Sequence, residues 1–529
     1  MTVLELAVVV LVFLATFDLW VGVTNDAVNF LNSALGSYVA KRRTIYIVAT
    51  IGILLGAFLS DGMMEVARKG IFNPSFFTMP DGHLDVRAIV IIYLAVMITD
   101  VIMLDFFNTF GLPTSTTVSI VSELLGASIA VAFFRYTDHS LVAAGEVINA
   151  GSAITIYVGI LLSVIVSFTG GALFMLLVRS FFTHDVKRTF KYYGGVWTGI
   201  CFAGMLYFVI FKAGGHASFM TADVKQWLSA HSWLIMGGVF LVATAIAQTQ
   251  AHRPERVFKV IILTGTGSLA AAFAGNDLVN FIGPTIAGYQ AVFIENVDMA
   301  GKVKTPLLGL LAAGILMALA LWKSKKAHSV SDTEIRLASN GDGMSQRFSG
   351  SSLARAIITA NRLVFKILLV LTPRGLVRLM DGRTRRPDPN KEVVEPPYDL
   401  LRATVNLTAA SVIISIGTAN KLPLSTTYVS FMVAMGASLA DRCWGTSAEA
   451  TERRVTGVLV VVAGWGLTGV LASTGAFIVG GIICALGIVP GVSTMLVLLA
   501  FSLWHMGRRH AKTFNVDDNI NGMLQKAVG

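Results

Sequence analysis

The sequence predicts an all-α polytopic membrane protein, built as an inverted-topology repeat with broken helices and two re-entrant helical hairpins. Three observations support this prediction. First, the 529 residues are 54% hydrophobic and only 14% charged, with a mean hydropathy of +0.71, whereas soluble proteins are about a quarter charged. Second, apolar runs recur along the whole chain, and a helix needs about 20 apolar residues to cross a bilayer. Third, two polar motifs each occur twice inside these runs.

The apolar runs predict the membrane helices in order. The first run, Val3–Val23, has no basic stretch before it and no small-residue cleavage site after it, so we expect a retained helix and not a signal peptide. The three cysteines lack the spacing of a metal site, and we expect neither a disulfide nor zinc. The runs fall at 3–22, 44–60, 88–108, 116–134, 150–178, 195–211, 232–247, 257–274, 306–322, 403–417, 427–440, 455–478 and 481–505.

The two repeated motifs indicate an internal duplication. The Asn-Asp motif occurs as TNDAVNF from Thr24 and as GNDLVNF from Gly275, at an offset of 251 residues. The LP-x-STT motif occurs as LPTSTT from Leu112 and as LPLSTT from Leu422, at an offset of 310. An insertion in the second half absorbs the difference of 59 residues. Chance does not favour Asn, Asp and Pro in apolar surroundings, and here they recur in the same order.

Basic residues set the topology, because cytoplasmic loops carry the excess of Lys and Arg. Placing Lys41–Arg43 inside puts the N-terminus outside. We take the helix pairs on either side of each LP-x-STT motif as re-entrant hairpins. The remaining basic clusters then all lie inside: 179–191, 252–259, 323–402, 453–454 and 508–512. The halves are inverted in this topology, and inverted repeats with broken helices are typical of secondary transporters with a site near the bilayer midplane.

The segment 323–400 is the insertion. The stretch from Lys323 to Arg402 holds 15 Lys/Arg and 8 Asp/Glu and supplies +7 of the net charge of +10. We attribute this excess to the cytoplasmic face and expect no nucleic-acid partner. Residues 328–352 have the composition of a disordered linker. Residues 353–371 predict a basic amphipathic helix, lying on the inner membrane surface or packed on the protein's own cytoplasmic face.

The Asn-Asp motifs predict an ion site. A carboxylate in a bilayer costs about 2.5–3.5 kcal/mol even on insertion scales and therefore needs a partner. In a helix the motif residues share one face, which offers oxygens to a cation and amide donors to an anion. Polar residues that only join helices are the alternative. The duplication favours a site made of Asn25, Asp26, Asn29, Asn276, Asp277 and Asn280.

The LP-x-STT motifs predict an anion site. Proline suits the first turn of a helix, and Ser and Thr cap its free N–H groups, where the helix dipole is positive. Simple capping needs one hydroxyl, whereas each motif supplies three. Because none of the four motifs contains Lys or Arg, an anion there needs a co-transported cation, which is the physical basis of symport. The candidate residues are Ser115, Thr116, Thr117, Ser425, Thr426 and Thr427.

The carboxylates favour phosphate over sulfate. At neutral pH phosphate still carries a proton that Asp26 or Asp277 can accept in a charge-assisted hydrogen bond, whereas sulfate carries none. A cation that screens both aspartates would weaken this discrimination. A sulfate or other oxyanion permease on the same scaffold is the alternative.

These motifs, GVTNDAVNF, AGNDLVNFIGPTIAG, GLPTSTTVS and KLPLSTTYVS, resemble the duplicated signatures of the PiT family of inorganic phosphate transporters. The resemblance covers both membrane halves and omits most of 323–400. It implies a cation-coupled phosphate symporter, with Asn25, Asn276 and the hydroxyl residues holding phosphate. Asp26, Asn29, Asp277 and Asn280 would serve the coupling ion and phosphate, with sodium placed at Asp26 and Asp277. Since some relatives carry sulfate, the anion stays open.

Other membrane carboxylates lack a partner in the repeat. Glu123 aligns with Val433, and we consider it for proton coupling against the alternative of a buried neutral acid. Asp18 is a similar candidate. Asp100 and Asp105 are equally unmatched.

Competing classes remain. An enzyme acting on phosphoryl groups would need a nucleophile beside a base or a metal cage, and the motifs contain no His, Cys or Lys, so we expect no enzyme. A sensor with 323–400 as its output is the other class. We expect no cofactor besides sodium or a proton. The expected partners are phosphate and the lipid bilayer of the plasma (inner) membrane, with a homo-oligomer as an open alternative to a monomer.

We divide the chain into six regions. They are 1–178, the first repeat; 179–256, linking helices; 257–322, the first part of the second repeat; 323–400, the insertion; 401–507, the remainder of the second repeat; and 508–529, the tail.

Overall fold

The fold of the computed structural model is helical. It describes residues 1–59, 71–80, 83–213, 221–294, 307–339, 349–360, 396–419, 424–444 and 448–513. In these ranges the extended structure consists of two isolated bridges, Phe72–Ile148 and Thr78–Leu84. Eleven helices are long and apolar enough to cross a membrane. The predicted class, an all-α polytopic membrane protein, is confirmed.

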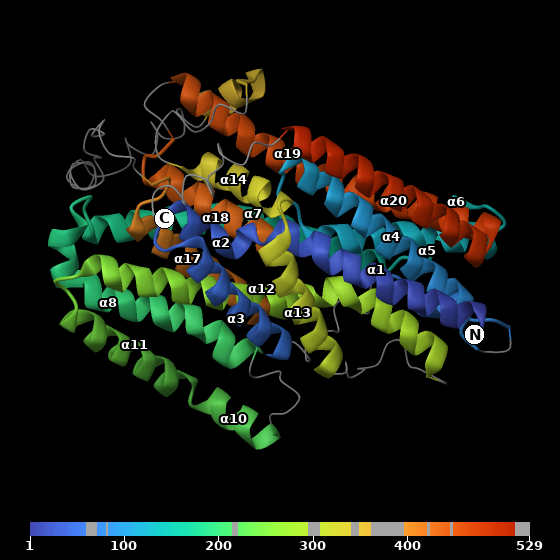
Figure 1. Ribbon diagram of the computed structural model, residues 1–529, viewed down its shortest axis with the longest axis horizontal. Coiled ribbons are helices and arrows are strands. Elements are labelled where there is room, and N and C mark those ends of the chain that lie inside the picture. Colours follow the sequence, from blue (N-terminus) through green and yellow to red (C-terminus); the bar gives the residue numbers. More distant parts are fainter. Residues whose placement is uncertain are drawn as a thin grey trace.

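The helices of the first half form a bundle that begins at one end of the molecule (Figure 1). Their bounds are α1 (Val3–Asp26), α2 (Val28–Gly36), α3 (Arg42–Leu59), η2 (Pro74–Phe77), α4 (Val86–Phe110), α5 (Thr116–Arg135), α6 (Leu141–Gly145) and α7 (Ala150–Phe181). Linking helices follow as α8 (Val186–Tyr207), η3 (Phe208–Ala213), α10 (Ala222–Ala230) and α11 (Ser232–Thr249).

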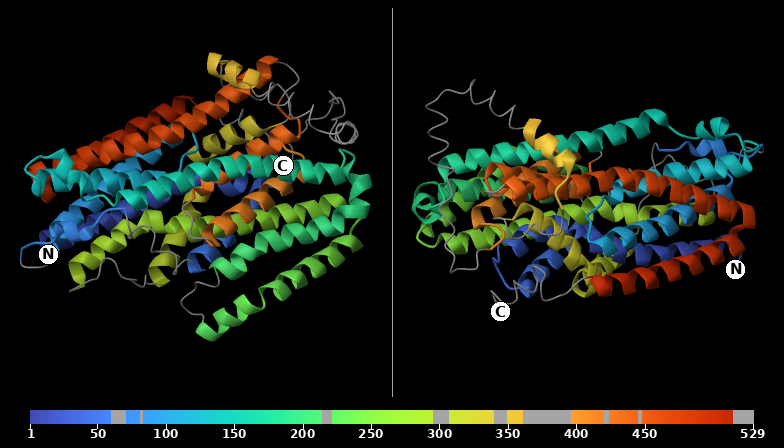
Figure 2. Two further views of the ribbon diagram at one scale, coloured as in Figure 1. Left: turned by 180° about the vertical axis from the view of Figure 1, so that it is seen from behind. Right: turned by 90° about the horizontal axis from the view of Figure 1, so that it is seen from above.

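The second half packs against the first along most of its length (Figures 1 and 2). It consists of α12 (Pro254–Phe293), α13 (Leu307–Lys323), α14 (Lys326–Ala338), α17 (Leu400–Ala419), α18 (Thr426–Ala440), α19 (Ala448–Leu486) and α20 (Ile488–Thr513). A short helix also covers 352–360. This helix is the described part of the amphipathic helix expected at 353–371, whose remainder lies outside the described residues.

Both LP-x-STT motifs start a helix through their serine. Ser115 accepts a hydrogen bond from the N–H of Val118, and Ser425 accepts one from the N–H of Tyr428. The turn before α5 begins at Gly111, whose φ of 62° is left-handed and suits glycine. The motifs therefore fold locally as their cap residues predict.

The helices α4 and α5 form one hairpin, whose open end lies at the start of α7. There the hydroxyl of Tyr136, just after α5, donates to Asp85, the cap of α4, over 2.6 Å. Burial and the Asp85 carboxylate raise the pKa of this phenol, so that it stays a donor. The bridge from Phe72 to Ile148 holds the same region against α7.

The helices α17 and α18 form a second hairpin, whose open end lies at the far end of α7. Arg179, near the end of α7, pairs with Asp399 just before α17 and with Asp441 just after α18. With 32 residues, α7 is about 48 Å long. The two hairpins therefore enter the bundle from opposite ends and meet inside it, which is the arrangement expected of inverted halves.

The buried Arg179 should be important for stability. Replacing it with Gln leaves the buried carboxylate of Asp441 without its closest cation, at a cost of about 3–5 kcal/mol. We expect a clear drop in melting temperature and in the amount of monodisperse protein, measured by fluorescence-detected size-exclusion chromatography after heating. Arg453→Gln breaks an ion pair with Glu449 that is largely exposed, and this control should change little. Equal melting of Arg179→Gln and wild type would contradict the assignment.

The two Asn-Asp motifs sit in different helical contexts. The first lies at the junction of α1 and α2, where Ala27 separates two helices. The second lies inside the continuous 40-residue helix α12. At the first motif the interruption is confined to Ala27, whose φ of −55° and ψ of −29° are still helical, and Val3–Gly36 runs as one apolar span. The predicted helix break is wrong at the second motif, where the helix is continuous. Pro284 in α12 removes only one backbone hydrogen bond, and the helix continues through it.

The linker prediction for the start of the insertion is wrong for 328–338. These residues belong to α14, which meets α13 at 73° and packs on α1, α2 and α4. Most polar side chains of α14 are buried, among them Glu334, which accepts a hydrogen bond from Asn32, while the half-buried Lys326 pairs with Asp105 at 2.5 Å. The polar composition resembled a linker, but it supplies contacts to other buried polar groups.

Candidate functional site

The described parts of the four motifs meet at one place, where the helices α5 and α18 begin. Thr427 of α18 donates to Asp26 Oδ1 at the end of α1 over 2.9 Å. Thr426 donates to Asp277 Oδ2 in α12 over 2.7 Å. All four side chains are buried. Residues far apart in the sequence thus form a single polar cluster inside an apolar bundle.

The contacts follow the duplication. The amide of Asn29 donates to Thr427 Oγ1 over 3.0 Å, and the amide of Asn280 donates to Thr117 Oγ1 over 3.3 Å. Each asparagine therefore reaches the hairpin of the other half. The hydroxyl of Thr116 also faces Asp26.

The carboxylate of Asp277 also has two threonine hydroxyls beside it, those of Thr117 and Thr426. Asp26 likewise has one threonine from each hairpin. This pattern is what a pseudo-twofold site between inverted halves would produce.

The carboxylate of Asp26 retains an unused acceptor. Its Oδ2 is buried and has no hydrogen-bond partner among the described residues. In contrast, both oxygens of Asp277 accept hydrogen bonds, from Asn280 and from Thr426. A buried, unpaired carboxylate oxygen is costly, so the position of Asp26 Oδ2 suits a cation or a proton.

Asn25 holds the first hairpin tip in place. Its amide donates to Asn108 Oδ1 and to the carbonyl of Leu112, and its oxygen accepts from the N–H of Thr114. The side-chain amide of Asn25, which was expected to bind phosphate, thus already makes three hydrogen bonds within the protein. The equivalent Asn276 is partly exposed, and the tip that would match Leu112, at 420–423, lies outside the described residues.

The two motif serines also have structural roles, because their oxygens cap α5 and α18. Each serine still has its own hydroxyl proton to donate. The four threonines and two aspartates are therefore the groups that face the centre of the cluster: Thr116, Thr117, Thr426, Thr427, Asp26 and Asp277.

A second acidic cluster lies two helical turns away from Asp26. Asp18 of α1 faces Asp100 of α4, and Asp100 faces Glu123 of α5. All three are completely buried. Both oxygens of Asp18, both of Asp100 and one of Glu123 lack a hydrogen-bond partner within the described ranges, while Ser119 donates to the remaining Glu123 oxygen over 2.7 Å.

This arrangement needs a proton or a cation to compensate its charge. Carboxyl groups that face each other in a buried site repel unless a proton lies between them. The charged groups that act on Asp18 are Asp100, Glu123 and Asp26, all of them acids. Among the described residues, no group of three or more His, Cys, Asp or Glu side chains is arranged to hold a metal ion. The sequence identified Asp18, Asp100 and Glu123 as unmatched acids, but their meeting depends on how α1, α4 and α5 pack.

A basic cavity of about 570 Å³ opens beside the first motif. Thr24 and Asn108 form the wall nearest to Asn25, and the hydroxyl of Thr24 donates to Ser324 between α13 and α14. Lysines and histidines form much of the opposite wall: Lys323, Lys325, Lys326, His328 and His510. This wall was not expected from the sequence, because most of α14 has the composition of a linker. Asp105, an unmatched acid, was the one signal that a base lies near.

A sequence model described as the phosphate transporter family matches residues 22–350, more than half of the chain. The chain belongs to the phosphate transporter family. With eleven candidate spans among its described residues, it is a multi-pass protein of the plasma membrane. The resemblance derived from the duplicated motifs is thereby confirmed at the level of the family.

Individual relatives of this phosphate transporter family protein are distant. A protein of Pyrococcus abyssi, named as a proposed phosphate permease, is 27% identical over 68% of this chain and 86% of its own length. A protein of Thermococcus kodakarensis with the same kind of name is 26% identical over 63% of this chain and 79% of its own. A solved structure, named as the sodium-dependent phosphate transporter, matches with a TM-score of 0.57 at 17% identity, covering 90% of this chain and 99% of that chain. This likeness concerns the fold.

Proposed function

We propose that this protein is a secondary symporter, not an enzyme, that moves inorganic phosphate together with a cation, sodium or proton. The observation that carries the proposal is the pair of buried aspartates, each flanked by one threonine from either hairpin. In the described part of the chain, the groups that act on Asp26 and Asp277 are acids and threonine hydroxyls, with no basic side chain among them. Phosphate at this place therefore needs a cation to compensate its charge.

Coupling follows from the hydrogen bonds of the threonines. A hydroxyl has one proton to donate, and Thr426 and Thr427 donate theirs to the aspartates. When a cation or a proton neutralises the carboxylates, these hydroxyls can turn to a phosphate oxygen instead. Helix N-termini at α5 and α18 add positive dipole ends to the same place. Neither ion is then stable at the site alone.

We assign phosphate contact to Thr116, Thr117, Thr426, Thr427 and Asn276. Ser115 and Ser425 cap the helices that follow, and Asn25 positions the tip of the first hairpin. Asp26 and Asp277, assisted by Asn29 and Asn280, take the coupling ion. The buried unpaired Oδ2 of Asp26 supports a cation there, and the structural neighbour is itself named as a sodium-dependent transporter. The second acidic cluster, Asp18, Asp100 and Glu123, supports a proton.

We further propose that the inverted repeats form the transport core, with the α4–α5 and α17–α18 hairpins re-entrant from opposite sides. The insertion 323–400 adds α14 to that core. Uptake of labelled phosphate into proteoliposomes, with sodium and pH gradients imposed separately, tests the function and identifies the ion. No accumulation under either gradient would contradict symport. Counterflow abolished by sulfate but not by arsenate would favour the sulfate permease.

Threonine substitutions test the phosphate cradle. Thr116→Val and Thr426→Val keep the shape of the side chain and remove one hydroxyl. A hydrogen bond to a charged group contributes about 1.5–3 kcal/mol, so we expect the KM for phosphate to rise about ten-fold or more. Initial uptake rates over a range of phosphate concentrations measure it. Thr155→Val on α7, whose exposed hydroxyl bonds only to the carbonyl of Gly151, is the control. An unchanged KM removes that threonine from the cradle.

A further inference from the structure

A cleft lies on the outer face of the protein, between the helices α8, α11 and α12. The helix α11 packs on α8 and otherwise leaves its apolar side chains exposed, among them Leu241, Val242 and Ile246. Figure 1 shows α11 along the outer edge of the bundle. This region is distant in the fold from the hairpin tips, and the proposed transport site makes no use of it.

The cleft has an apolar part, a groove of about 580 Å³ between α11 and α12 with α8 as its floor. Val242 and Ile246 line one wall, Val257 and Val260 the other, and Phe202 the floor. Along α11 the groove extends from Gly238 to Gln250, which is about 18 Å at the helical rise per residue. A Cβ at Gly238 would meet nothing within 4 Å, so this end of the groove is open.

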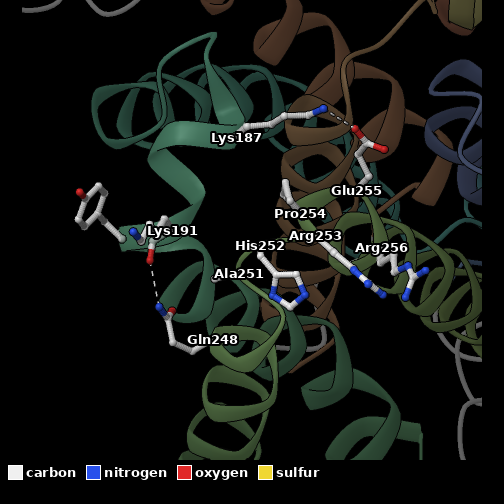
Figure 3. A pocket seen from close by; sticks show the side chains of 10 residues that line it. Lys187, Lys191, Gln248, Ala251, His252, Arg253, Pro254, Glu255 and Arg256 are labelled. Atoms are coloured by element: carbon white, nitrogen blue, oxygen red, sulfur yellow. Dashed lines mark hydrogen bonds and ion pairs between the residues drawn. The ribbon is translucent and has the colours of Figure 1, made fainter.

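The cleft also has a basic part, a pocket of about 790 Å³ where α8 and α12 begin (Figure 3). Lys187, Lys191, Arg253 and Arg256 contribute four cations, and His252 lies among them. Lys187 pairs with Glu255 at 3.0 Å. Lys191, Arg253 and Arg256 have no ion pair within the described residues, which leaves an uncompensated positive charge. Figure 3 shows Lys191 on one side of this pocket and Arg253 and Arg256 on the other.

The two parts are continuous, because Arg256 lines both. A cationic pocket joined to an apolar groove matches an amphiphile with an anionic head and a long tail. The basic end lies at the start of α8, five residues after α7 ends. By the excess of basic residues this end faces the cytoplasm, and the cytoplasmic leaflet carries the anionic lipids.

We propose that this cleft binds an anionic phospholipid of the inner leaflet. The headgroup phosphate accepts hydrogen bonds from Arg253, Arg256 and Lys191, and one acyl chain lies along α11 between Gly238 and Gln250. Arginine suits this role because its planar fork of donors matches phosphate. A second copy of the chain is a poorer occupant, since a twofold interface would place the same basic patch of both copies close together.

The test uses the full-length protein purified in a mild detergent. Phosphatidylglycerol and phosphatidylcholine with identical acyl chains are titrated separately, while the melting temperature is recorded and bound lipid is counted by native mass spectrometry. We expect phosphatidylglycerol to bind and to raise the melting temperature, and phosphatidylcholine to bind at least ten-fold more weakly. Equal binding of the two lipids would overturn the proposal.

Three variants separate the head from the tail. Arg253→Gln with Arg256→Gln should weaken phosphatidylglycerol binding about thirty-fold, because each basic residue contributes about five-fold at a membrane surface. Lys191→Gln changes one exposed residue and should weaken it about five-fold without affecting folding. Gly238→Phe should fill the groove. It should weaken binding of the long-chain lipid and leave the affinity for soluble glycerol phosphate unchanged.

The matched control is Lys225→Gln, which removes a partly exposed charge on α10 outside the cleft. It should bind phosphatidylglycerol as wild type does. Three results would overturn the proposal: unchanged binding in the arginine and lysine variants, glycerol phosphate binding as tightly as the lipid, or a change of oligomeric state in place of lipid loss. The last result would identify the cleft as an interface between copies. Phosphate uptake by these variants is measured separately and does not decide the lipid site.

Discussion

Asp26→Asn and Asp277→Asn should each abolish net phosphate uptake while the protein still inserts and folds. Asparagine keeps the size of the side chain and loses its charge, so the cation no longer has a carboxylate to bind. Loss of one member of a buried charge pair costs about 2–5 kcal/mol of binding free energy. That corresponds to a decrease of about thirty-fold or more. Asp26 should be the more sensitive position for the cation, because it retains a buried oxygen without a partner among the described residues.

The measurement is uptake of labelled phosphate into proteoliposomes with equal amounts of incorporated protein. Asp138→Asn, in the exposed loop after α5, is the control and should transport normally. Wild-type uptake by either aspartate variant would exclude that carboxylate from the site. Loss of uptake together with loss of monodisperse protein would point to folding instead, and a melting temperature recorded for each variant separates the two outcomes.

Neutral variants of the second acidic cluster should uncouple protons from phosphate. In Asp18→Asn, Asp100→Asn and Glu123→Gln we expect phosphate accumulation driven by a pH gradient to be lost. Exchange of internal for external phosphate should continue near the wild-type rate, because exchange requires no net movement of protons. We assign proton coupling to this cluster because its three carboxyl groups are buried and face one another, and the charged groups that act on Asp18 include no base.

Proton flux measured with a pH-sensitive dye inside the vesicles checks this prediction. The groups facing the cluster from neighbouring helices are Ser119, Tyr157 on α7 and Asp26. Glu146→Gln, an exposed acid after α6, is the matched control. Proton movement with phosphate at the wild-type ratio in all three variants would contradict the role. Lost exchange would show instead that these acids belong to phosphate binding itself.

The helical class and the meeting of the motifs could be predicted from the sequence for a physical reason. Asp26 and Asp277 lie in apolar runs, where a carboxylate must find a partner, and the duplicated LP-x-STT motifs offered hydroxyls at helix starts. The different roles of Asn25 and Asn29 could not be predicted from the sequence, because the two residues lie four apart on one helical face. Asn25 turns to the first hairpin and Asn29 to the second, and only the packing of the tips decides between them.

Other features depend on long-range packing that composition does not encode. The residues of α14 are polar enough for a linker, yet Glu334 and Lys326 are held by Asn32 and Asp105 in other helices. Likewise, the second Asn-Asp motif predicted a broken helix, whereas α12 is continuous. Local pattern gives the tendency to form a helix, but interhelical contacts decide which polar groups are buried and where a helix ends.

The position of α14 has a consequence for the transport cycle. This helix is held to α2 through Asn32 and to α4 through Asp105. Any motion that separates α2 from α4 must therefore break one of these two contacts. The helix α14 belongs to the inserted segment of the second half, yet it raises the activation barrier for moving α2 relative to α4 in the first half. It can therefore set the rate of turnover without contacting the transported ions.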